Sequence, residues 1–125
     1  MTDTWVFLIR EPDWDSDAYL PENRSSLGAQ FDEDMAAHGR FAAAVDELGG
    51  KIVSSYALQN RKYGGTVTPG KDGADPVWSD APLPDSSEVI TGFYAVQCDE
   101  DVARTLAAQV PTGNVIEMRK VHPFE

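Results

Sequence analysis

The chain has 125 residues, 42% of them hydrophobic and 10% aromatic, which suits one domain with an ordinary core and excludes a disordered chain. Its formal net charge of −11 repels nucleic acid and anionic membrane surfaces, so neither is expected as a partner. The only cysteine, Cys98, excludes an internal disulfide framework and a cysteine-rich zinc module.

The chain ends and the apolar runs bear on location. The first residues lack the basic segment and the long apolar run of a signal peptide. No apolar run approaches the roughly 20 residues that a membrane-spanning helix needs. We therefore expect a soluble, cytoplasmic protein formed by a single domain over residues 1–125.

A strand and a polar loop open the chain. Residues 5–9 are a continuous apolar run, which indicates a strand buried on both faces. Residues 11–28 are rich in Asp, Ser, Pro and Gly and show no hydrophobic period. We expect an acidic loop there, as a lid or a local insertion, with one short turn at most.

The acidic residues of this loop invite comparison with a calcium site. Asp13, Asp15 and Asp17 resemble the start of an EF-hand loop. That loop requires Gly at its sixth position and Glu at its twelfth, where this chain has Ala18 and Arg24. We therefore expect a solvated acidic loop and no metal site.

An amphipathic helix is predicted from residue 31 to residue 48. Asp32, Glu33 and Asp34 occupy its first turn, where the helix dipole favours negative charge, and Gly49 and Gly50 end it. Its apolar stripe recurs every three or four residues and places a histidine towards the sheet. The stripe consists of Phe31, Met35, His38, Phe41, Ala42, Val45 and Leu48.

The second half of the chain alternates strands with one more helix. A helix capped by Asp99 and ended by Pro111 is expected before the last strand. The order of elements indicates an α+β protein, the ferredoxin-like split βαβ fold with an antiparallel sheet and two helices on one face. A second copy would cover the bare face, which predicts a homodimer. The expected strands are residues 51–58, 66–68, 76–78, 89–98 and 114–121.

Several motifs together resemble the YCII-related domain family, in its DGPF branch. The helix segment Met35-Ala-Ala-His38-Gly-Arg-Phe41 closes on Leu48-Gly-Gly50, as in that family. Asp80-Ala81-Pro82-Leu83 stands in the place of the Asp-Gly-Pro-Phe motif. The matching register continues with Glu88, Gly92-Phe93-Tyr94 and the ending Val115-Ile116-Glu117-Met118-Arg119.

The resemblance implies a subunit that pairs into a dimeric α+β barrel. It also implies an active site built on a histidine and an aspartate, which by position are His38 and Asp80. Most of the family has no known function, and one related member resembles a dehydrochlorinase, a lyase acting on a chlorinated aromatic diol. Ala81 and Leu83 depart from the motif, which puts the specificity of the pocket in doubt more than its location.

A histidine beside an aspartate makes chemical sense as an acid/base pair. The carboxylate fixes the imidazole tautomer and raises its basicity, so the ring exchanges protons near neutral pH. Two structural readings stand beside this one. A histidine on an apolar helix face is often a core residue satisfied by one hydrogen bond, and an aspartate before Ala-Pro is often a turn former.

Three further residues are candidate substrate-binding groups. Arg119 lies on the last strand, where a guanidinium can hold a carboxylate, although an ion pair with Glu117 also explains it. Tyr56 is a second candidate. Glu88 would be a further acid in the pocket or a solvated loop charge.

These features leave three hypotheses open. The first is a cofactor-independent lyase or isomerase, with His38 as acid/base and Asp80 as its orienting partner, acting on a small cyclic or aromatic molecule. The second is a non-catalytic dimeric module that binds a small ligand or an accessory partner, and the third is a structural dimer with a filled pocket. No dinucleotide fingerprint, P-loop or serine elbow occurs, so no cofactor is expected.

Overall fold

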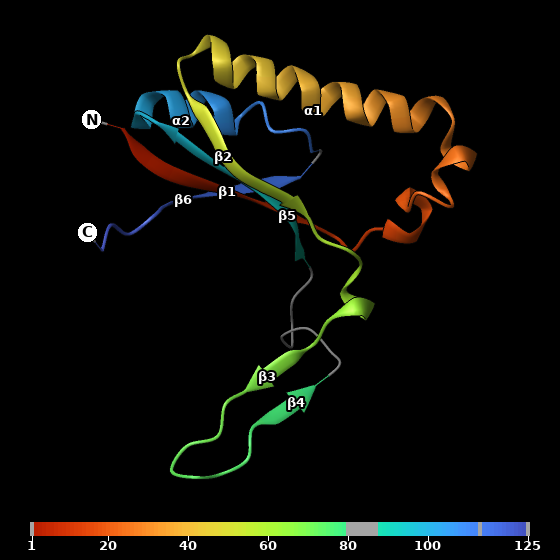
Figure 1. The fold of residues 1–125 in the computed structure, drawn as a ribbon, viewed down its shortest axis with the longest axis vertical. Helices are drawn as coiled ribbons and strands as arrows, with labels where there is room; N and C mark the ends of the chain where they lie inside the picture. Colours follow the sequence, from red (N-terminus) through yellow and green to blue (C-terminus); the bar gives the residue numbers. More distant parts are fainter. Residues whose placement is uncertain (1, 80–87, 113, 125) are drawn as a thin grey trace.

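The computed structural model describes residues 2–79, 88–112 and 114–124. Within these residues, a four-stranded antiparallel sheet carries two helices on one face (Figure 1). This α+β architecture confirms the predicted class and is compatible with a ferredoxin-like fold. The strand order is β2-β5-β1-β6. The elements are β1 (Asp3–Glu11), α1 (Ala29–Glu47), β2 (Lys51–Ala57), β5 (Val89–Cys98), α2 (Glu100–Ala107) and β6 (Val115–Lys120).

The remaining elements are short. Two 3-10 helices, η1 (Ser16–Tyr19) and η2 (Arg24–Leu27), lie in the segment for which the sequence predicts a loop with one turn at most. A third, η3 (Arg61–Tyr63), follows β2. The strands β3 (Thr66–Thr68) and β4 (Val77–Ser79) pair with each other in a separate two-stranded sheet, and Figure 1 shows this hairpin projecting away from the main sheet.

The first strand is buried on one face only. Trp5, Phe7 and Ile9 are buried, whereas Val6 and Leu8 between them are half-buried. Successive side chains on a strand point to opposite faces, so the first set lies under the helices and the second lies on the bare face. The expectation of burial on both faces is therefore wrong for the single chain, because both helices cover the same side.

The core joins both helices to the sheet. Phe41 of α1 is 2% exposed, and its ring centroid lies 6.4 Å from that of Phe7 and 4.5 Å from that of Tyr94. Leu106 of α2 is fully buried in the same cluster. Burial of such aromatic and aliphatic side chains is the main favourable contribution to folding.

The buried face of α1 differs from the predicted stripe in one informative way. Met35 and Leu48 are 55% and 42% exposed. Asp34, which the sequence places among dipole-favoured surface charges, is half-buried, and it falls in register with Phe31 and His38. The helix ends at Glu47, one residue before the predicted end, and Gly49 follows it with a φ of 79°, which glycine adopts readily and other residues rarely.

Cationic residues around η3 fix the acidic loop in place. Arg61 Nε lies 3.0 Å from a carboxylate oxygen of Asp13. Asp17 accepts hydrogen bonds from Lys62 Nζ at 2.5 Å and from the Tyr63 hydroxyl at 2.6 Å. The hydrogen bond from Lys62 is the largest cause of a lowered pKa at Asp17, and the bond from Tyr63 lowers it further. The loop is thus held by ion pairs between segments more than 40 residues apart and requires no metal ion for this.

Among the described residues, no helix has the length and apolar character needed to cross a membrane. The cytoplasmic location expected from the sequence stays a prediction.

Truncation of the α1 anchor tests this description of the core. Phe41→Ala should lower the free energy of unfolding by about 3–5 kcal/mol, because it removes a buried ring and leaves a cavity. Met35→Ala on the same helix removes an exposed side chain and should cost less than about 1 kcal/mol. Urea unfolding followed by circular dichroism measures both, and equal losses would contradict the assigned buried face.

Candidate active site

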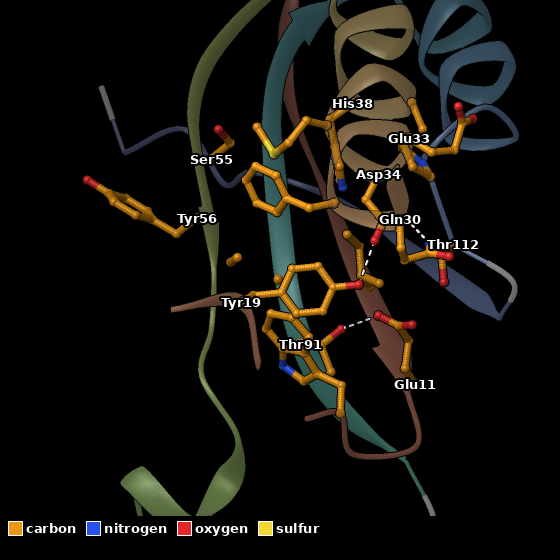
Figure 2. A pocket seen from close by; sticks show the side chains of 18 of the residues that line it. Glu11, Tyr19, Gln30, Glu33, Asp34, His38, Ser55, Tyr56, Thr91 and Thr112 are labelled. Atoms are coloured by element: carbon orange, nitrogen blue, oxygen red, sulfur yellow. Dashed lines mark hydrogen bonds between the residues drawn. The ribbon is translucent and has the colours of Figure 1, made fainter. Parts of the chain in front are cut away.

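An open cavity of about 1070 Å³ lies beside the first half of α1. Its walls come from that half of the helix, from the ends of β1, β2 and β5, and from η1 with the residues before it. Figure 2 shows the side chains of 18 of the residues that line it. Trp14, Tyr19 and Phe31 form an aromatic wall, with ring centroids 5.3 Å apart for the first pair and 6.3 Å for the second.

His38 contacts the sheet through Tyr94. The His38 Nδ1 atom lies 2.5 Å from the Tyr94 hydroxyl oxygen, and both residues line the cavity. Two hydrogen-bond patterns fit a neutral ring. Either the hydroxyl donates to a bare Nδ1, or a protonated Nδ1 donates to the hydroxyl oxygen. In both cases Nδ1 is engaged and Nε2 is the remaining nitrogen for proton exchange.

Burial decides the charge of this pair. Partial burial lowers the pKa of His38 below its ordinary value of 6.5, and the nearby charges of Asp34 and Glu11 only partly offset this. Burial also raises the pKa of the Tyr94 hydroxyl above 10.0. Both groups are therefore neutral at pH 7. A neutral imidazole is the form that accepts a proton as a general base.

A bulge in β5 supplies a hydrogen-bond donor to the cavity acid Glu11. The pairing of β1 with β5 shifts between Ile9 and Arg10, so that Thr91 has no direct partner in the ladder. The Thr91 hydroxyl instead donates a hydrogen bond of 2.5 Å to Glu11 Oε1. Bulges of this kind often re-aim side chains next to functional sites, and here both residues line the cavity (Figure 2).

Asp34 is a further carboxylate of the cavity that hydrogen bonds hold in place, and it lies one helical turn before His38. One carboxylate oxygen of Asp34 accepts a hydrogen bond of 2.5 Å from the Tyr19 hydroxyl. The other accepts one of 2.9 Å from Gln30 Nε2. This pair of contacts fixes the carboxylate and ties η1 to α1. The carboxylate also raises the pKa of the Tyr19 hydroxyl.

The sequence-predicted site residues fall in different places. His38 lies in the cavity wall. Asp80, with the Ala81-Pro82-Leu83 motif, lies outside the described residues, so the His38–Asp80 pair stays a prediction. Glu88 immediately precedes β5 and is half-buried, and it is not among the described residues that line the cavity.

Arg119 and Tyr56 are directed away from His38. Arg119 pairs across the ladder with Val6, so it lies on the face opposite the helices, and it forms an ion pair of 3.2 Å with Glu117. Tyr56 stands at the cavity rim on the edge strand. Its side chain is 67% exposed, and Figure 2 shows it projecting to the far side of β2.

Two cavity acids, Glu11 and Asp34, are absent from the site residues predicted from the sequence, although both fall at buried-face positions of the hydrophobic periods of β1 and α1. Glu11 continues the odd-numbered set of β1 that includes Phe7 and Ile9, so a period of two places it on the helix-covered side. Asp34 precedes His38 by four residues, so both lie on one helix face. If the periods of β1 and α1 are counted through polar as well as apolar residues, they place Glu11 and Asp34 on the faces that meet at the cavity.

Within the described residues no cluster of three or more His, Cys, Asp or Glu side chains has the arrangement of a metal site. Cys98 is buried, and burial raises the pKa of its thiol, which makes it a poor nucleophile. Among the described residues the cavity offers a neutral histidine, three tyrosine phenols and four carboxylates, of which Glu11 and Asp34 are half-buried.

Comparisons with known proteins leave the family open. No protein-family model matches the chain, and a search of curated proteins gave no match.

The lowered pKa of His38 has a consequence for stability. Because the folded chain disfavours the protonated ring, the neutral ring contributes stability that is present above pH 6.5, its ordinary pKa, and lost as the pH falls towards the folded pKa. Wild type should therefore lose stability relative to His38→Gln as the pH falls below this value. Urea unfolding of both proteins at pH 7.5 and at pH 5 measures the change, and a relative gain for wild type at low pH would refute it.

Proposed function

We propose that this protein is a cofactor-independent enzyme of the lyase or isomerase type, in which His38 exchanges a proton with a small cyclic or aromatic molecule. Membership of the YCII-related family, inferred from sequence resemblance, belongs to the same proposal. The observation that carries it is a neutral histidine in the wall of an open, aromatic cavity, with Nδ1 held at 2.5 Å by the Tyr94 hydroxyl.

The access of His38 to an open cavity supports an acid/base role over a purely structural one. A histidine that served only the core would be sealed from solvent, whereas His38 is half-buried and lines an open cavity. With a proton on Nδ1, the bare Nε2 accepts a proton from a substrate carbon or oxygen. After that transfer the imidazolium returns the proton to another atom of the substrate or to a leaving group.

Two residues compete for the role of orienting partner. The family resemblance gives it to Asp80, and the geometry of the described residues favours Tyr94, which already contacts Nδ1. In the proposal Tyr94 holds the ring, and the role left for Asp80 is on Nε2 or on the substrate. Asp80→Asn and Tyr94→Phe distinguish these assignments.

Proton exchange can be assayed while the net reaction is unidentified. A panel of cyclic and aromatic compounds with activated C–H bonds, with and without an amino group, would be incubated in D2O and followed by proton NMR. On any compound that wild type exchanges, His38→Gln should lower the rate by about 10²- to 10⁴-fold. Tyr94→Phe should lower it by about tenfold or more through loss of ring orientation.

The control is Met35→Gln, which changes an exposed residue of the same helix at the cavity rim and should retain most of the rate. Exchange that persists at the wild-type rate in His38→Gln would exclude His38 as the acid/base group. Exchange lost in Asp80→Asn and kept in Tyr94→Phe would return the orienting role to Asp80.

A non-catalytic ligand-binding module is the second candidate. The observation that favours it is the fixed position of both carboxylates. Thr91 holds Glu11, and Tyr19 with Gln30 holds Asp34. Polar groups that are already oriented reduce the cost of ordering on binding. A ligand bound tightly by wild type and by His38→Gln, with no proton exchange in either, is the result that favours this candidate.

We also propose that the protein is a homodimer joined through the bare face of the sheet. Val6, Leu8 and Phe93 are half-buried on this face, and Ala95 beside them is 8% exposed. Both helices lie on the other side. A second copy of the same face is a self-complementary cover with two-fold symmetry.

A charge in the middle of this face tests the dimer. Val6→Lys should shift the protein from dimer to monomer in sedimentation velocity experiments, because its neighbours across the ladders are Arg119 and Ala95 and a lysine buried at the interface would lack an acidic partner. Ala43→Lys adds the same charge on the exposed side of α1 and should leave the dimer intact. A wild-type monomer at about 100 μM, a concentration at which even interfaces of μM affinity are occupied, would disprove the dimer.

A further inference from the structure

The charge of the cavity is one-sided. Its lining contains the carboxylates of Glu11, Asp15, Glu33 and Asp34, the titratable His38, and no lysine or arginine among the described residues. A cavity with walls of one sign concentrates ligands of the opposite sign. Which carboxylates are available for a ligand depends on what already neutralises them.

Two of these four acids, Glu33 and Asp15, lie near cationic side chains of the protein. Glu33 forms an ion pair of 3.0 Å with Arg40 on the exposed side of α1. Asp15 is exposed and lies close enough to Lys62 to raise the pKa of that lysine. Glu33 is therefore neutralised by a cation outside the lining, whereas Asp15 is a solvent-exposed charge near a lysine that is already bonded to Asp17.

Glu11 and Asp34 have only neutral partners. The donors are the hydroxyls of Thr91 and Tyr19 and the amide of Gln30, at 2.5–2.9 Å. No described lysine or arginine forms an ion pair with either carboxylate. His38 does not compensate them at neutral pH, because burial keeps its ring neutral. Two half-buried negative charges are thus left without a cation.

Aromatic rings stand beside these charges. The wall formed by Trp14, Tyr19 and Phe31 is continuous, and the Tyr19 ring carries the hydroxyl that holds Asp34. Aromatic faces attract cations within about 6 Å of the ring centre. Phe31 already shows this behaviour, since the guanidinium carbon of Arg24 lies 5.0 Å from its centroid, although Arg24 is not among the lining residues.

We propose that the cavity binds an organic cation, namely a primary or secondary amine attached to an aromatic or cyclic body. The ammonium group donates hydrogen bonds to Glu11 and Asp34, and the body packs against Trp14, Tyr19 and Phe31. An ammonium that carries N–H bonds suits two carboxylate acceptors better than a quaternary cation, which has no donor. This inference rests on the proposed function in using the same cavity, and it names the substrate class.

The same charges exclude anionic ligands. A carboxylate or phosphate entering the cavity would meet Glu11 and Asp34 without any lining lysine or arginine, among the described residues, to hold it. A bare metal ion is also a poor fit, because the described residues offer no metal-binding cluster. The volume of about 1070 Å³ corresponds to a drug-sized organic molecule.

Three probes of similar shape separate charge from hydrophobicity. They are 2-phenylethylamine, 2-phenylethanol and 3-phenylpropanoate, which are positive, neutral and negative at pH 7.5. Titration followed in nitrogen–proton correlation spectra should show the amine binding at least about tenfold more tightly than the alcohol. The carboxylate should not bind, and the indole signal of Trp14 should shift with the amine.

The variants assign the effect to named carboxylates. Glu11→Gln and Asp34→Asn keep the side-chain shape and should each weaken amine binding by about tenfold, since each removes one charge-assisted hydrogen bond. Glu33→Gln is the matched control, because Arg40 already neutralises that lining acid, and its affinity should match wild type. Circular dichroism verifies that each variant is folded.

Failure of this inference is distinguishable from failure of the acid/base proposal. His38→Gln should keep its affinity for 2-phenylethylamine and lose proton exchange. Amine binding that is no tighter than alcohol binding, or that is unchanged in Glu11→Gln and Asp34→Asn, overturns the cation site and leaves the role of His38 standing. Selective amine binding with proton exchange that does not depend on His38 overturns the acid/base proposal alone.

Discussion

The unequal length of the two helices is the constraint on which the site depends. α1 has 19 residues and α2 has 8, yet both pack on the same face of one sheet. The buried anchors of α1, Phe41 and Val45, lie in its second half, and they share the core with α2. The first half continues beyond that core, and the space between it and the strand ends is the cavity.

Polar side chains line this space because β1 and α1 continue beyond the core, and residues on their inward faces there are polar. Glu11 extends the inward-facing set of β1, and Asp34 with His38 extends the inward-facing stripe of α1. Half-buried charges are costly unless they are hydrogen-bonded, and neutral donors from η1, α1 and the β5 bulge supply those bonds. The result is a cavity lined by carboxylates beside an imidazole that burial keeps neutral at pH 7.

Most elements of the fold can be predicted from the sequence, because each has a strong local signal. The stripe from Phe31 to Val45 indicates α1, and the apolar run at residues 89–98 matches the bounds of β5. The shape of the acidic loop cannot be predicted in this way. It depends on contacts such as Asp13 with Arg61, which join segments that no local pattern relates.

The candidate site is predictable in part. The helix period identifies His38, but its partner Tyr94 lies on a strand 56 residues away. The sequence alone does not distinguish Tyr94 from the other aromatic strand residues, which could lie in the core, at an interface or in the pocket. When only apolar residues are counted in the hydrophobic periods, Glu11 is interpreted as the end of a strand. Asp34 is then interpreted as a surface charge that the helix dipole favours. Arg119 is not among the described residues that line the cavity, because the strand register pairs it with Val6 on the opposite face, and its substrate-binding role stays a prediction.

The charge and tautomer of His38 test the central claim most directly. Nitrogen-15 chemical shifts of its imidazole at pH 7, assigned by comparison with His38→Gln, report which ring nitrogen carries a proton. The account predicts a neutral ring with its proton fixed on Nδ1, and a shift of Nδ1 that is altered in Tyr94→Phe. A protonated ring at pH 7, or rapid averaging of both tautomers that Tyr94→Phe leaves unchanged, would contradict it.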